Sequence, residues 1–152
     1  MRLALYQTEI AQNVGTILRL AACLGVPVDV IEPVGFPWDD RRFRRAGMDY
    51  LDFVAVTKHR SFEAFWQQKC GRVVLLDVKA TQSYASVQLL PTDIFLLGRE
   101  SDGVPDDIFY RCEVQVRIPM VPQVRSLNVA LSAAIVLSHA VNVLQEGHQK
   151  LV

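Results

Sequence analysis

Short apolar runs alternate with stretches of helical periodicity in the first thirty residues. Residues 3–6 form an apolar run too short for a helix, so we expect a buried strand there. Apolar side chains then recur at helical spacing over residues 14–22, with Asn13 as the expected N-cap and Gly25 as the C-terminal stop. A second strand is expected at residues 27–31. A strand, a helix and a strand in this order form a βαβ unit, which predicts a parallel sheet.

The same alternation continues through the middle of the chain. Strands are expected at residues 54–56, 73–78, 94–97 and 114–118, and helices at residues 39–47, 61–70 and 105–110. Continuous apolar strands are typical of a sheet that is covered on both faces. The pattern has no internal repeat and no linker. It predicts one α/β domain over residues 1–152, with a mainly parallel sheet and helices on both faces.

The last element differs from the others because residues 126–146 are apolar or small at nearly every position. This predicts a helix buried on all sides, with Ser126 as its N-cap. One domain of 152 residues can cover only part of such a helix. We therefore expect a second subunit to cover the rest, as a homodimer.

Composition narrows the function classes. The chain has 16 basic and 16 acidic side chains and no net charge, yet twelve of the basic residues are arginines, which suit phosphates and planar acceptors. No apolar run reaches the roughly 18 residues of a membrane span, and the N-terminus does not resemble a signal peptide. We expect a cytoplasmic protein with no membrane or DNA partner. Three widely spaced cysteines predict buried thiols and no metal site.

Three clusters of residues could carry chemistry. The first is the helix start from Asn13 to Arg19, where a plain N-cap is the alternative explanation of the asparagine. The second is residues 98–105, a glycine-containing loop directly after an apolar strand, where ligands of open α/β sheets bind. It matches neither the dinucleotide nor the triphosphate fingerprint, and a simple glycine turn is the alternative. The third, residues 118–130, feeds the last helix and includes Ser126 and Asn128.

In this order, the three clusters resemble the SPOUT superfamily of trefoil-knotted methyltransferases. Residues 31–50, which read IEPVGFPWDDRRFRRAGMDY, narrow the resemblance to the TrmL/YibK-like tRNA 2′-O-methyltransferases. The resemblance extends from residue 1 to about residue 145. One departure is the last motif, which ends in Asn128, Val129 and Ala130 where the family usually has a second serine.

The resemblance implies a SPOUT fold with a deep C-terminal trefoil knot, a homodimer, and S-adenosylmethionine as methyl donor without a metal. The product would be a 2′-O-methyl group on the wobble nucleotide, cytidine or uridine 34, of leucine tRNAs. Donor contacts are implied at Leu76, Gly98, Glu100, Gly103, Ile118 and Ser126. Catalytic roles are implied for Asn13, Arg19, Ser126 and Asn128.

Arg19 is the expected group at the ribose 2′-oxygen. A guanidinium does not give up its proton in proteins, so we expect it to orient the acceptor or to stabilise negative charge rather than to act as a base. For tRNA phosphates the candidates are Arg41, Arg42, Arg44, Arg45 and Arg125, with Lys58 and Arg60 beside them. A solvated helix face is the alternative explanation for the four clustered arginines.

Three other functions remain open. The first is 2′-O-methylation of another tRNA or ribosomal RNA ribose, since SPOUT motifs indicate the type of reaction better than they indicate the nucleotide that is methylated. The second is a non-catalytic RNA-binding module that retains the donor pocket. The third is a flavodoxin-like small-molecule binder, which would explain the strands and helices but not the arginine excess.

Overall fold

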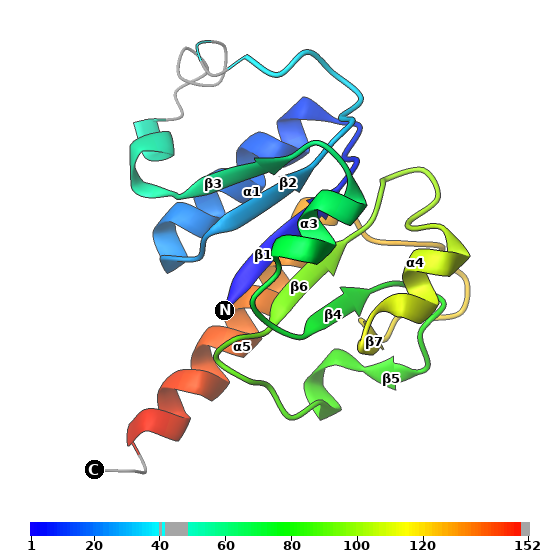
Figure 1. Ribbon diagram of the computed structural model, residues 1–152. Helices are drawn as coiled ribbons and strands as arrows, with labels where there is room; N and C mark the ends of the chain where they lie inside the picture. Colours follow the sequence, from blue (N-terminus) through cyan, green and yellow to red (C-terminus); the bar gives the residue numbers. More distant parts are fainter. Residues whose placement is uncertain (40, 42–48, 150–152) are drawn as a thin grey trace.

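One sheet of seven parallel strands organises the described part of the chain, residues 1–39, 41 and 49–149 of the computed structural model (Figure 1). Its strand order is β3-β2-β1-β6-β4-β7-β5. The strands are β1 (Arg2–Tyr6), β2 (Val28–Ile31), β3 (Val56–His59), β4 (Val73–Leu76), β5 (Gln82–Ser83), β6 (Ile94–Leu97) and β7 (Val114–Arg117). The predicted α/β class with a parallel sheet is confirmed.

Helices cover both faces of the sheet. They are α1 (Ala11–Leu24), α3 (Phe62–Gln68), α4 (Asp106–Arg111) and α5 (Val129–Gln149), with 3-10 turns η1 (Asp49–Phe53) and η2 (Tyr84–Ser86). Alternate residues of β1 point to opposite faces, so Leu3 and Leu5 pack in the core that includes α1 and α5. Tyr6 packs in a second core with Phe65 of α3 and Ile108 of α4. The trefoil knot stays a prediction of the resemblance, because strand pairing does not define how a chain is threaded.

Several boundaries differ from the predicted ones. The strand expected at residues 54–56 is β3, two residues later, and β5 and η2 were not predicted. Helix α1 begins at Ala11, so Asn13 is not its N-cap but lies inside the first turn. The charged helix expected at residues 39–47 lies outside the described residues, apart from Asp39 and Arg41.

The caps of the other helices follow local chemistry. Gly25 ends α1 in the left-handed conformation, with φ 65°, as predicted. Ser61, the first residue of the helix expected at residues 61–70, caps α3 by accepting a hydrogen bond from Ala64 N–H at 3.1 Å. Helix α5 begins at Val129, and its cap is Asn128 rather than Ser126. The Asn128 Oδ1 atom accepts from Ala130 N–H at 2.8 Å, which satisfies one of the open donors at the helix start.

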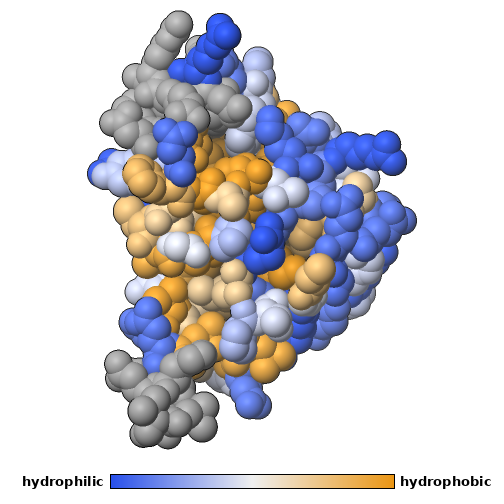
Figure 2. All heavy atoms as spheres, turned by 60° about the vertical axis from the view of Figure 1, so that its left-hand side comes forward, coloured by the Kyte–Doolittle hydropathy of each residue, from blue (hydrophilic) through white to orange (hydrophobic). Residues whose placement is uncertain are grey.

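Helix α5 is not buried on all sides within one chain. Ala133, Val136, Leu137 and Ala140 are fully buried, and the helix packs against α1. Leu131, however, is 59% exposed. Figure 2 brings the left-hand side of Figure 1 forward, and hydrophobic residues gather over much of this face. Within a single chain, part of the apolar surface of α5 therefore stays exposed, whereas the sequence pattern predicts that this surface is covered.

The three cysteines do not share one environment. Cys112 is buried as predicted, and burial raises the pKa of its thiol to about 12. Cys23 and Cys70 are exposed, so the prediction of buried thiols was wrong for them. Both lie close to the end of a helix, α1 or α3, where the chain turns at the protein surface. No helix in the described ranges is long and apolar enough to span a bilayer.

Candidate functional site

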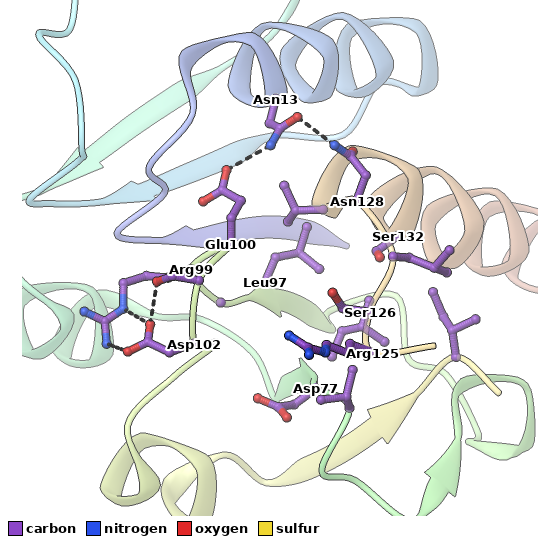
Figure 3. Close-up of a pocket in the computed structure, with 18 of the residues that line it drawn as sticks. Asn13, Asp77, Leu97, Arg99, Glu100, Asp102, Arg125, Ser126, Asn128 and Ser132 are labelled. Atoms are coloured by element: carbon purple, nitrogen blue, oxygen red, sulfur yellow. Dashed lines mark hydrogen bonds and ion pairs between the residues drawn. The ribbon is translucent and has the colours of Figure 1, made fainter. Parts of the chain in front are cut away.

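A cavity of about 640 Å³ opens at the carboxyl ends of β4, β6 and β7 (Figure 3). Ligands of open α/β sheets bind at this edge, and the volume lies within the roughly 300–1,000 Å³ of small-molecule sites. Four segments form the walls: the start of α1, the loop after β4, the loop after β6, and the loop between β7 and α5. Their apolar members include Leu76, Leu97, Ile118, Leu127 and Val129.

The loop after β6 is a tight hairpin that only glycine permits at two positions. Arg99 and Gly103 exchange backbone hydrogen bonds of 3.0 and 3.1 Å. A Cβ atom on Gly98 would lie 2.6 Å from the carbonyl carbon of Gly103, so the two backbones could not approach. Gly103 has φ 70°, and a Cβ atom there would lie 2.9 Å from Asp77 Oδ2. The glycines therefore bring the hairpin close to the loop after β4 and shape one wall of the cavity.

Glu100, in this hairpin, points its carboxylate away from solvent toward the segment after β1. Its Oε1 accepts from Thr8 Oγ1 at 3.0 Å and from Asn13 Nδ2 at 3.1 Å, and its Oε2 accepts from Glu9 N–H at 2.8 Å. Burial raises the pKa of Glu100, but the hydrogen bonds from Glu9, Asn13, its own N–H and Thr8 together lower it below the ordinary value. A carboxylate with three donors and a lowered pKa is a poor proton acceptor, so it holds the loop in place.

Two asparagine side chains continue this network across the cavity. Asn13 Oδ1 accepts from Asn128 Nδ2 at 3.0 Å, while Asn128 Oδ1 caps helix α5 (Figure 3). Asn13 is only 8% exposed, so both ends of its amide need a partner. Glu100, Asn13 and Asn128 come from the three separate sequence clusters. The fold joins these clusters into one hydrogen-bonded chain.

The predicted donor-contact residues meet at this cavity. Its lining includes Leu76, Gly98, Glu100, Gly103, Ile118 and Ser126. Asn13 and Asn128, predicted to be catalytic, also line it, as does Arg125 from the predicted RNA-binding set. Sequence reasoning missed Thr8 and Glu9, which contact Glu100. Their signal was available, since polar residues directly after a buried strand lie at the ligand-binding edge of a parallel sheet.

Arg19 is not among the described residues that line the cavity. It is exposed on α1, and its guanidinium carbon lies 4.8 Å from the centre of the Tyr50 ring. Arg19 follows Asn13 by six residues, which places it about 9 Å further along the helix axis and on a different face of α1. Arg19 is therefore available to a ligand at the protein surface rather than to one inside the cavity of its own chain.

Three of the predicted RNA-binding residues, Arg42, Arg44 and Arg45, lie outside the described residues. Arg41 and Arg60 are exposed. The Lys58 ammonium lies 4.8 Å from the centre of the Trp38 ring, a cation–π contact beside the arginine-rich segment. Among residues 1–39, 41 and 49–149, no group of three or more His, Cys, Asp or Glu side chains could hold a metal ion.

Comparison with known families and relatives places this site in context. The model of the SpoU rRNA methylase family matches residues 1–138. A tRNA (cytidine(34)-2′-O)-methyltransferase of Beijerinckia indica is 57% identical over 141 residues, which cover 91% of this chain and 88% of the relative. The protein of the same description from Escherichia coli K12 is 39% identical over 143 residues, covering 92% and 91% of the two chains.

Solved structures agree with these relatives. One, described as giving insight into the 2-OH methylation of C/U34 on tRNA, superposes with a TM-score of 0.88 at 36% identity and covers 95% of this chain and 90% of its own. An AdoMet-bound rRNA methyltransferase from Sinorhizobium meliloti superposes with a TM-score of 0.83 at 25% identity, covering 94% of this chain and 56% of its own.

Proposed function

This chain belongs to the SpoU rRNA methylase family, and we propose that it transfers a methyl group from S-adenosylmethionine to the ribose 2′-oxygen of nucleotide 34, cytidine or uridine, in leucine tRNAs. The observation that carries this proposal is the meeting of the three sequence clusters at one cavity, through Glu100, Asn13 and Asn128. Relatives that are 39% and 57% identical over most of this chain are tRNA (cytidine(34)-2′-O)-methyltransferases, which supports the address at nucleotide 34.

The cavity fits an adenosine-containing donor. Its apolar walls suit the face of an adenine ring. The hairpin wall at Gly98 and Gly103 packs as closely as it does because a Cβ atom at either position would collide with the Gly103 backbone or with Asp77. Leu76, Gly98 and Ile118, which line the cavity after β4, β6 and β7, would hold the donor together with Ser126 on the loop that leads to α5. When bound, S-adenosylmethionine would supply a methyl group on a positively charged sulphur, so that a bond from an oxygen nucleophile to the methyl carbon forms as the carbon–sulphur bond breaks and neutral S-adenosylhomocysteine leaves.

The chain's own residues then position the acceptor. Transfer to a ribose hydroxyl needs an aligned oxygen, release of the hydroxyl proton to solvent, and stabilisation of the negative charge that develops on the oxygen as the proton leaves. Ser126 and Asn128 carry polar groups at the cavity, on the loop before α5 and at its cap. Arg19 is exposed on α1 outside the cavity of its own chain, so we assign it to the acceptor tRNA at the protein surface. Glu100 keeps its proton-free form through its three donors and holds the donor loop rather than taking a proton.

The assignment of Arg19 is tested by separating donor binding from turnover. We expect Arg19→Ala to abolish methyl transfer while the affinity for S-adenosylmethionine, measured by calorimetry, stays within a few-fold of wild type. Arg117→Ala, another exposed arginine outside the cavity lining, is the matched control and should keep both properties. Parallel loss of donor binding in Arg19→Ala would contradict an acceptor role.

The clustered arginines are proposed to grip tRNA phosphates. The logarithm of the tRNA binding constant falls linearly with the logarithm of the salt concentration, and each phosphate contact that is lost should reduce the magnitude of this slope by roughly 0.7 to 0.9. We therefore expect the pair Arg42→Ala and Arg44→Ala to weaken tRNA binding and to flatten this slope. An unchanged affinity and slope would remove these residues from the interface.

A homodimer is proposed because apolar side chains remain exposed on α5. Most soluble homo-oligomers are symmetric dimers, in which the same surface of each subunit pairs with itself. Leu131→Glu should produce a monomer in analytical ultracentrifugation, whereas Gln67→Glu, at an exposed polar position of α3 on the opposite face of the sheet from α5, should leave the wild-type mass. A wild-type protein that sediments as a monomer would contradict the dimer.

The experiment that tests the whole function is transfer of a labelled methyl group from S-adenosylmethionine into total tRNA of a strain lacking this gene, followed by nuclease mapping. Label on the wobble ribose of leucine tRNAs is the expected result. Label on another tRNA or ribosomal ribose would support 2′-O-methylation as the reaction but would exclude nucleotide 34 of leucine tRNAs as the target. Donor binding without any transfer would favour the non-catalytic RNA-binding module instead.

A further inference from the structure

The charged side chains that line the cavity in the described part of the chain are Asp77, Lys79, Arg99, Glu100, Asp102 and Arg125. Most of them already have partners within the protein. Arg99 pairs with Asp102 at 2.9 Å, and the Lys79 ammonium pairs with Asp106 at 3.0 Å. Glu100 accepts hydrogen bonds from three donors. Only Asp77 and Arg125 form no ion pair within residues 1–39, 41 and 49–149, either with each other or with another side chain.

The backbone around Asp77 fixes the position of its carboxylate. Asp77 N–H donates to Val116 O at 2.9 Å, which extends the pairing of β4 with β7 by one residue. Asp77 Oδ1 accepts from Lys79 N–H at 2.9 Å, a local turn that sets the direction of the side chain. A Cβ atom on Gly103 would lie 2.9 Å from Asp77 Oδ2, so this oxygen has room only because residue 103 is a glycine. Oδ2 accepts no hydrogen bond from any described residue.

Arg125 lies on the loop between β7 and α5, directly before Ser126. Its side chain is exposed and lines the same cavity as Asp77. Figure 3 shows both side chains on the side of the cavity away from Asn13. One end of the cavity therefore offers a carboxylate and a guanidinium that the described part of the protein leaves without a counter-ion.

We propose that Asp77 binds the ammonium group, and Arg125 the carboxylate group, of the methionine tail of S-adenosylmethionine. The assignment rests on the proposed function and deepens it, because it states which part of the donor this end of the cavity distinguishes. An ammonium donates charge-assisted hydrogen bonds to a carboxylate, and the guanidinium fork matches a carboxylate in shape. Asp77 is half-buried, so a bound ammonium offsets the cost of removing its charge from water. Arg125 then serves the donor rather than a tRNA phosphate.

The test is a set of binding measurements that do not depend on turnover and contain no tRNA. Calorimetry gives the dissociation constants of S-adenosylhomocysteine, of its analogue without the amino group, of its analogue without the carboxylate, and of methylthioadenosine, which lacks the whole amino-acid tail. For wild type we expect loss of either group to weaken binding at least about tenfold, as for the loss of a hydrogen bond to a charged group.

Two variants assign each group of the tail to its residue. Asp77→Asn keeps an oxygen that can accept from Lys79 N–H but removes the charge, so it should bind S-adenosylhomocysteine and the analogue without the amino group within about twofold of each other. Arg125→Met should likewise stop distinguishing the analogue without the carboxylate. Both variants should bind methylthioadenosine within about twofold of wild type, which shows that the rest of the cavity is intact.

Asp107→Asn and Arg117→Met are the matched controls. Both residues are exposed, lie outside the described cavity lining, and should keep the wild-type differences among the compounds. The assignment is overturned if wild type does not distinguish the compounds, or if either cavity variant still does. It is also overturned if Asp77→Asn weakens methylthioadenosine as much as S-adenosylhomocysteine, because the carboxylate would then act on the nucleoside. Failure of the proposed function appears differently, as wild-type protein that distinguishes the compounds but transfers no methyl group to leucine tRNA.

Discussion

Asn13→Ala removes the central link between Glu100 and Asn128 without adding a clash. The substitution breaks the hydrogen bond to Glu100 Oε1, 3.1 Å long, and the one from Asn128 Nδ2, 3.0 Å long. A hydrogen bond to a charged group contributes about 1.5–3 kcal/mol, and one between neutral groups about 0.5–1.5 kcal/mol. Alanine regains up to about 0.7 kcal/mol of helix propensity. The expected loss is therefore roughly 2–3 kcal/mol in the free energy of unfolding.

The assay is urea unfolding followed by circular dichroism, at one fixed protein concentration because association also stabilises a folded chain. Thermal melts of the same samples should show a midpoint about 5–10 °C lower, given about 2–4 °C per kcal/mol for a chain of this size. Thr16→Ala is the control on the same helix. Thr16 is exposed and its hydroxyl donates only to Gln12 O at 3.0 Å, so this change should cost less than about 0.5 kcal/mol.

Equal stability of Asn13→Ala and Thr16→Ala would show that the hydrogen bonds of Asn13 do not stabilise the fold. A double-mutant cycle with Asn128→Ala refines the test, since the two side chains bond directly. A coupling energy near zero would mean that the bond between the two amides contributes nothing to stability, whatever each side chain contributes alone.

Three further outcomes are expected. Gly98→Ala should weaken S-adenosylhomocysteine binding at least tenfold in calorimetry, since its Cβ atom would lie 2.6 Å from the Gly103 backbone, and wild-type affinity would contradict the tight hairpin. Cys112 should resist maleimide in the native protein at pH 8, because burial raises its pKa to about 12, while the two exposed cysteines react; mass spectrometry of the labelled peptides decides this. Because the pKa of Glu100 is lowered in the folded protein, its ionised form stabilises the fold at pH values above the ordinary pKa of 4.5. Resistance to urea should therefore fall as the pH drops through and below 4.5. This fall should be less steep in Glu100→Gln.

Much of the fold could be predicted because apolar runs and end signals are local. β1, β4 and β6 lie in continuous apolar stretches, and Gly25 and Ser61 end and begin their helices through contacts with nearby residues. The strands that were shifted or missed are those at the edges of the sheet. β3 has exposed residues at its centre. β5 consists of two polar residues that form a strand only because they pair with β7, and a two-residue strand has no hydrophobic periodicity to detect.

Many of the residues that line the candidate cavity were identified from the sequence, but the hydrogen bonds between them were not. Glu100 and Asn13 were both identified, but their contact spans 87 positions of sequence, so nothing near Asn13 distinguishes a network residue from an N-cap. Glu9 lies shortly after a buried strand, which marks the ligand-binding edge of the sheet, but its contact with Ser101 spans 92 positions and could not be predicted. The sequence also placed Arg19 in one cluster with Asn13. The helix separates them, since residues six apart point to different faces.

We propose that the ribose 2′-oxygen of nucleotide 34 in leucine tRNA receives the methyl group. Two leucine tRNAs that differ only at that position, one with the normal ribose and one with a 2′-deoxyribose, test this when each is incubated with the protein and labelled S-adenosylmethionine. We expect label in the first tRNA and none in the second. Equal labelling of both tRNAs would rule out nucleotide 34 as the acceptor, because the methyl group would then lie elsewhere.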